Sequence, residues 1–149
     1  MTKSPECFNS LPEGLHRTGR VLRGRLVEAL FHLGYDYPVE FWPTLNFVKS
    51  NPNASQHEIA AYLVRDKATV ARLLSRMERE KLVKRTVDPK NRRQKLVEIT
   101  EHGDTSFSNI ASCAMDIRHH AEQGISAEDL QTCQHVLERV FANLNNNIT

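Results

Sequence analysis

The chain has 149 residues, 40% apolar and 26% charged, which is the composition of a folded globular protein and excludes a disordered polymer. No apolar run approaches the roughly 18 residues that a membrane-spanning helix needs, and the first 14 residues lack the apolar segment of a signal peptide. The three cysteines, at positions 7, 113 and 133, form no paired framework. We therefore expect a single soluble, cytoplasmic chain with no membrane partner.

The net charge of +2 hides an uneven distribution. Residues 1–64 are neutral, residues 65–95 carry a net charge of +8, and residues 96–149 carry −6. A strongly basic segment in an otherwise near-neutral protein indicates a surface that faces a polyanion.

Leucine and alanine recur at helical spacing from residue 15 to 33, which predicts a first helix, and Gly34 is expected to end it. After a turn over residues 35–38, a short second helix is expected. Its apolar face would comprise Phe41, Trp42, Leu45 and Val48. Residues 51–54 are typical of a loop.

The sequence Ser55-Gln56-His57-Glu58 has the pattern of a capping box and predicts a short helix that runs to Leu63. After a brief turn, Asp66 is expected to cap a helix over residues 67–80. Two β-prone runs, 82–87 and 94–99, flank a turn and predict a hairpin.

Thr100 is expected to cap a long helix that ends at Gly124, and a last helix follows. The predicted order, four helices, a hairpin and two helices, describes a mostly α fold with a small β wing. The single chain of residues 1–149 would divide into a winged helix-turn-helix lobe over 36–100 and dimerisation helices over 10–34 and 101–146.

The basic segment covers the second helix of the pair and the hairpin. A recognition helix enters the DNA major groove with its N-terminal residues nearest the bases, so Arg72 is expected to reach a guanine edge, whereas Arg76 and Arg79 suit phosphates. Arginines at a projecting hairpin loop suit a narrow minor groove. The predicted DNA contacts are Ser55, Lys67, Ala68, Thr69, Arg72, Arg76, Arg79, Lys90, Arg92 and Arg93, with Asp88 expected to pair with a hairpin arginine.

Each of these features alone has a plainer explanation. A basic helix face is usually just solvated, a basic hairpin often protects a sheet edge, and a winged helix can serve as a protein-interaction module. Their combination within 31 residues favours DNA binding. An enzyme that uses Asp116 with His119 or His120 as an acid–base pair is the alternative from another class, but the sequence has no nucleophile motif, phosphate loop or zinc spacing.

The central segment resembles the MarR family of bacterial transcription regulators. The family's Leu-Glu-x-x-Gly-Leu-Val-x-Arg run is matched by residues 77–85, its wing signature Asp-Pro-x-Asp-x-Arg by residues 88–93, and its Leu-Thr-x-x-Gly by residues 99–103. Shorter matches are Ile59-Ala60, Thr69-Val70 and the segment around Trp42. The departures are Lys81 for glycine, Asn91 for aspartate and Phe41 for glutamine.

The resemblance implies a homodimer on a pseudo-palindromic DNA site, usually a repressor that a signal releases. The sequence supports dimerisation independently, because a monomer should not expose the apolar stripes of its terminal helices. Two copies would set their recognition helices about 34 Å apart, one turn of DNA. The expected interface residues are Leu15, Leu22, Leu130, Val136, Leu137, Val140, Phe141 and Leu144.

The resemblance also implies a small aromatic ligand between the dimerisation helices and the lobe. The matching positions are His16, Arg20, Tyr37, Phe41 and Trp42, although Phe41 and Trp42 are more simply explained as core residues. Redox sensing at Cys7 is a second option for the signal. A metal site at Asp116 is a third, but the adjacent His119 and His120 point about 100° apart, which favours a solvated face. No cofactor or metal is expected.

Overall fold

The computed structural model describes residues 10–145. The chain divides into two compact units, Met1–Ala114 and Met115–Thr149. The first unit contains helices α1 (Leu11–His32), α2 (Phe41–Ser50), α3 (Gln56–Leu63) and α4 (Lys67–Arg79), a small sheet, and the first part of α5 (Glu101–Glu122). The rest of α5 and helix α6 (Ala127–Asn145) form the second unit.

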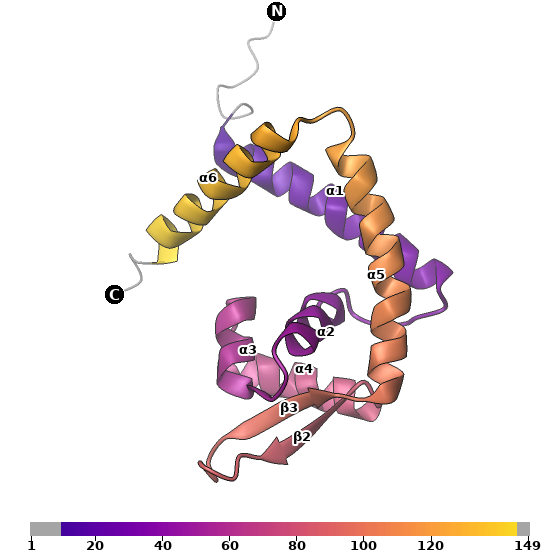
Figure 1. Cartoon of the computed structure of the whole chain (residues 1–149), viewed down its shortest axis with the longest axis vertical. Coiled ribbons are helices and arrows are strands. Elements are labelled where there is room, and N and C mark those ends of the chain that lie inside the picture. Colours follow the sequence, from indigo (N-terminus) through magenta and orange to yellow (C-terminus); the bar gives the residue numbers. More distant parts are fainter. Residues whose placement is uncertain (1–9, 146–149) are drawn as a thin grey trace, which may run out of the picture. The chain divides into compact units, whose positions relative to one another are not determined.

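The sheet has three antiparallel strands in the order β1-β3-β2. Strands β2 (Val83–Val87) and β3 (Lys95–Ile99) form the predicted hairpin, with Val83 opposite Ile99. Strand β1 (Ala54–Ser55) pairs with β3 on its other edge, where Ala54 lies opposite Val97. Figure 1 shows the hairpin loop projecting away from helices α2, α3 and α4. The predicted helix-turn-helix followed by a wing is therefore confirmed.

The core lies between α2, α3, α4 and the sheet, because the apolar faces of these elements point at one another. Phe41 and Leu45 of α2 and Leu74 and Met77 of α4 are fully buried. Trp42 is only partly buried and stacks on Phe107 of α5, with ring centroids 5.3 Å apart. The first part of α5 thus packs against the same lobe.

Helices α1, α3 and α4 each end in a Schellman motif, in which a residue of positive φ follows the helix. At the end of α1 this residue is Gly34, with φ of 77°, and the N–H groups of Gly34 and Tyr35 donate to the carbonyls of Phe31 and Leu30. The predicted cap at Gly34 is confirmed. The equivalent residues after α3 and α4 are Val64, with φ of 52°, and Lys81, with φ of 59°.

Helix α5 begins against the end of α4. The Thr100 hydroxyl accepts a hydrogen bond from the Gly103 N–H at 2.9 Å, which confirms the predicted cap, and the Thr100 N–H donates to the Leu82 carbonyl at 3.0 Å. A Cβ atom on Gly103 would lie 1.9 Å from the Leu82 carbonyl oxygen. The close approach of helix and backbone therefore requires glycine at position 103.

Helix α6 differs from the others because it buries no residue within the chain. Val136, Leu137, Phe141 and Leu144 are all exposed, Leu144 to 68%. None of the helices within residues 10–145 is long and apolar enough to cross a membrane.

Candidate nucleic-acid interface

Helix α4 starts with a hydrogen-bonded cap that reaches Arg72. Asp66 accepts the Thr69 N–H at 2.9 Å and the Thr69 hydroxyl at 2.6 Å. These two bonds lower the pKa of Asp66 from its ordinary value of 3.8 and keep it ionised. The Thr69 oxygen in turn accepts from the Arg72 guanidinium at 3.3 Å. This hydrogen bond fixes the direction of the Arg72 side chain near the N-terminal end of α4.

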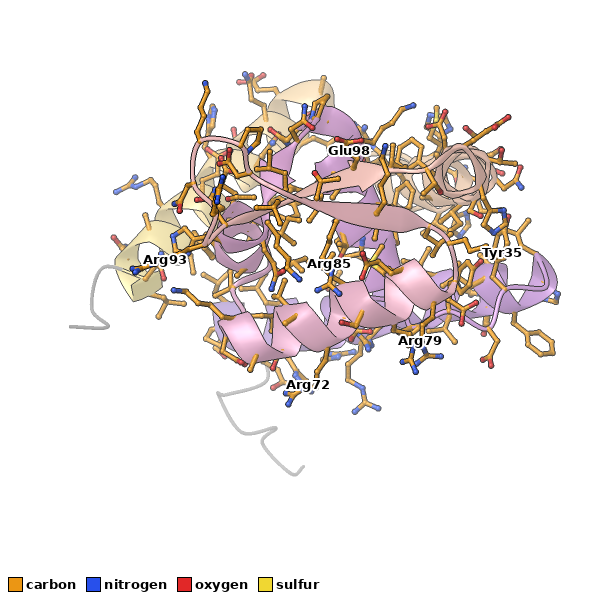
Figure 2. All side chains as sticks on the ribbon, turned by 90° about the horizontal axis from the view of Figure 1, so that it is seen from below. Tyr35, Arg72, Arg79, Arg85, Arg93 and Glu98 are labelled. Carbon is orange, nitrogen blue, oxygen red and sulfur yellow. The ribbon has the colours of Figure 1, made fainter. Side chains whose placement is uncertain are left out.

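The outward face of α4 is basic. Figure 2 shows Arg72 and Arg79 projecting from the side of α4 that is turned away from the sheet. Lys67 and Ala68 are exposed at the start of the helix. This face combines a small N-terminal end with long cations further along, as predicted.

Arg76 is oriented differently from its neighbours. Its guanidinium carbon lies 5.8 Å from the centre of the Phe41 ring, and its Nη2 atom lies 3.5 Å from the Asp36 carbonyl oxygen. The side chain is partly buried. Arg76 therefore packs on the lobe, which makes it a poorer candidate for a phosphate contact than Arg79.

Two side chains of the hairpin loop accept hydrogen bonds from backbone N–H groups of the same loop. Asp88 accepts the Lys90 N–H at 2.8 Å, and the Asn91 side-chain oxygen accepts the Arg93 N–H at 3.2 Å. The side chains of Lys90, Arg92 and Arg93 remain exposed. The predicted pairing of Asp88 with a hairpin arginine is wrong, because within residues 10–145 this carboxylate forms no ion pair and instead shapes the turn.

Ser55 does not belong to the exposed surface. Its side chain is 2% exposed, and its hydroxyl accepts the Glu58 N–H at 3.1 Å while Glu58 accepts the Ser55 N–H at 2.7 Å. The capping box is confirmed. The prediction of Ser55 as a DNA contact is wrong, because the same hydroxyl is buried by its capping role.

Arg85 links α4 to the wing and was not among the predicted site residues. Its Nε atom donates to the Glu78 carboxylate at 2.9 Å, its backbone N–H donates to the other oxygen at 3.0 Å, and its Nη2 atom donates to the Ser75 hydroxyl at 2.9 Å. Figure 2 shows Arg85 between the helix and the sheet. The Arg85 hydrogen bonds lower the pKa of Glu78. The sequence does carry a signal for this pair. The family run that residues 77–85 match contains a Glu and an Arg seven positions apart, at the positions of Glu78 and Arg85.

A cavity of about 430 Å³ lies beside α4, within the first unit. It is mostly apolar and bounded by α1, α2, the end of α3 and α4. Its lining residues include Leu22, Leu26, Val39, Trp42, Leu63, Thr69, Val70 and Leu73. Thr69, whose hydroxyl oxygen accepts from Arg72, thus also belongs to the lining of this cavity.

Of the five predicted ligand residues, Trp42 lines this cavity. Phe41 is 0% exposed and belongs to the core, and Tyr37 packs against Phe41 with ring centroids 5.4 Å apart. His16 and Arg20 lie on the exposed surface of α1, outside the cavity lining. These four residues lie outside the lining of this cavity, and their role in ligand binding stays a prediction.

The polar edge of the cavity is an ion pair. The Arg23 Nη2 atom lies 2.7 Å from a Glu40 carboxylate oxygen, and Arg65 lies in the same lining. Burial raises the pKa of Glu40, but the hydrogen bond and charge of Arg23 outweigh it and leave the pKa below 4.5. Glu40 therefore stays ionised at neutral pH.

The other two predicted signals are redox sensing at Cys7 and a metal site at Asp116. Cys7 lies outside the described residues; Cys113 is partly buried and Cys133 is exposed on α6. Within residues 10–145, no three His, Cys, Asp or Glu side chains come together as a metal site.

The chain is similar to proteins of one family. The sequence profile of the MarR family matches residues 35–94. A curated relative, the HTH-type transcriptional repressor IacR from Pseudomonas putida, is 26% identical over 109 residues, which are 73% of this chain and 65% of that protein. The chain therefore spans just under two thirds of the length of this relative.

Two solved structures have the same fold over nearly the whole chain. The structure of the MepR–DNA complex from S. aureus has a TM-score of 0.82 and 21% identity, with 93% of this chain and 99% of that chain covered. CouR from Rhodococcus jostii RHA1, bound to p-coumaroyl-CoA, has a TM-score of 0.80 and 21% identity, with 92% and 95% covered. The winged helix-turn-helix lobe therefore matches the MarR family profile over residues 35–94, and the chain has the fold of these two structures.

Proposed function

We propose that this chain is a sequence-specific DNA-binding transcriptional regulator that represses its target as a homodimer. The observation that carries the proposal is the pairing of an exposed arginine face on α4 with an exposed basic loop on the adjoining hairpin. The helix suits a major groove and the loop a neighbouring minor groove. The repressor name of the relative IacR and the DNA bound to MepR support it.

Dimerisation follows from the uncovered apolar side chains of the terminal helices. Phe31 on α1 is 78% exposed, and Phe141 and Leu144 on α6 are 51% and 68% exposed. Each large apolar side chain that becomes buried contributes roughly 1.5–3 kcal/mol before entropy costs. A second copy of the chain would cover these faces and set two recognition helices on a pseudo-palindromic site.

The cavity beside α4 is the place where a small ligand would act as the signal. Its apolar lining and the Arg23–Glu40 pair at its edge suit a flat apolar molecule with a polar group. An occupant in contact with Thr69 would disturb the oxygen that orients Arg72. The acyl-CoA bound to CouR supports a ligand-controlled member of this fold.

Selection of bound fragments from the source genome, followed by gel shifts with the selected and a scrambled duplex, tests the proposal. Arg72→Ala is expected to reduce the preference for the selected duplex, whereas Arg92→Ala is expected to weaken binding to both. Unchanged affinity in both variants, or a flat salt titration of the wild type, would instead favour a protein-interaction module.

A further inference from the structure

A basic cleft separates the start of α4 from the wing. It has a volume of about 510 Å³, and its walls come from α3, α4 and the β2–β3 hairpin. Three cations, Lys67, Arg93 and Lys95, belong to the lining, which contains no carboxylate. Within residues 10–145, none of these three forms an ion pair. The charge of Arg85, which also reaches the cleft, is balanced by Glu78.

The other polar side chains of the cleft are mainly carboxamides. Gln56, Asn91 and Gln94 line it and supply N–H donors. The Asn91 oxygen is already used to accept the Arg93 N–H, which leaves its amide nitrogen to donate. A phosphodiester carries negative charge and presents acceptor oxygens, so cations together with amide donors match its chemistry.

The geometry of strand β3 turns one lysine into this cleft. Side chains alternate along a strand, so Lys95 lies on the same face as buried Val97. Lys84 on β2 is opposite Glu98 and pairs with it at 2.7 Å, on the outer face of the hairpin. The two lysines belong to the same hairpin but lie on opposite faces.

We propose that this cleft binds the backbone phosphates of one DNA strand, with Lys95 and Lys67 as the contacts. The proposal rests on the DNA-binding function proposed above and adds a site to it. A phosphate held between recognition helix and wing fixes both elements on the same strand. Such a contact sets position and affinity and carries no sequence information.

Duplex affinity as a function of salt concentration tests the proposal, measured on the full chain with a labelled selected duplex and a labelled scrambled one. Lys95→Gln is expected to reduce the log–log salt slope by about 1 and to leave the ratio of the two affinities unchanged. Lys67→Gln is expected to reduce the slope by a similar amount. Lys95→Arg keeps the charge and should retain the wild-type slope. Lys84→Gln, the matched control on the outer face, should also retain it.

Wild-type slopes in both cleft variants would overturn the cleft proposal, and so would an equal loss in Lys84→Gln. A loss confined to Lys67→Gln would overturn it as well, because Lys67 already lies on the recognition helix. Each of these results leaves DNA binding itself intact. A wild-type chain with no salt-dependent affinity for duplex DNA would instead remove the proposed function.

Discussion

The Arg85 side chain on β2 clamps the Glu78 carboxylate on α4, and its backbone N–H binds the same carboxylate. The side chain of Arg85 is 13% exposed and that of Glu78 is 32% exposed, so the pair is partly shielded from water. It joins the recognition helix to the wing, the two elements that would have to read DNA together.

Loss of this clamp should lower the stability of the lobe. Arg85→Met keeps most of the apolar volume but leaves the partly buried Glu78 without its side-chain partner, and we expect the free energy of unfolding to fall by about 2 kcal/mol. Lys84→Met is the matched control on the same strand, because Lys84 pairs with Glu98 in a more exposed site. Its expected cost is below about 1 kcal/mol. Urea unfolding at fixed protein concentration measures both, and equal losses would contradict the assignment.

The same pair predicts a pH dependence of stability. Arg85 lowers the pKa of Glu78 in the folded chain below its ordinary value of 4.5. The pair therefore contributes its full stability above the unfolded-state pKa and loses it as the pH falls through the folded-state pKa. Glu78→Gln should be less stable than wild type at neutral pH, and the difference should shrink in acid. Urea unfolding across this range measures it, and a constant difference would rule out the ionic origin.

Local patterns in the sequence predicted the helices, the hairpin and the caps at Gly34, Ser55 and Thr100. They did not predict β1, because its two residues pair with a strand more than 40 positions away and carry no periodic signal. Ser55 shows why the site residues were harder to predict. A serine suits a helix cap and a DNA contact equally well, and only its burial in the folded chain distinguishes the two roles. The Glu78–Arg85 contact crosses a turn and depends on tertiary packing.

Two helix ends place a side chain where glycine is preferred. Val64 and Lys81 both have positive φ, and the positive-φ region disfavours β-branched residues most. Lys81→Gly is expected to raise the free energy of unfolding by about 0.5 kcal/mol, and Val64→Gly by about 1 kcal/mol. Urea unfolding measures the two gains. A loss of stability in both variants would show that neither position is strained.

Substitutions of the two arginines at the end of α4 should differ in their effect on DNA binding. Arg79 is exposed, whereas Arg76 lies over the Phe41 ring. Arg79→Ala is therefore expected to reduce the salt slope of duplex binding by about 1. Arg76→Ala should keep the wild-type slope and lower the free energy of unfolding by about 0.5–1 kcal/mol, the size of a surface cation–π contact. Equal loss of slope in both variants would contradict this division.

Gly103 tests how closely α5 must approach the end of α4. A Cβ atom there would lie 1.9 Å from the Leu82 carbonyl oxygen and 2.9 Å from the Ile99 side chain. The Leu82 carbonyl also accepts the Thr100 N–H, so moving it would disturb the cap of α5. We therefore expect Gly103→Ala to lower the free energy of unfolding by about 3 kcal/mol.

Gly24→Ala is the control for this substitution. Gly24 lies inside α1, and a Cβ atom added there would meet no heavy atom within 4 Å, so alanine should stabilise that helix by up to about 1 kcal/mol. The two substitutions add the same methyl group and should shift the urea midpoint in opposite directions. If Gly103→Ala unfolds at the wild-type midpoint, α5 does not need glycine at this contact, and the glycine of the matched Leu-Thr-x-x-Gly run has another cause.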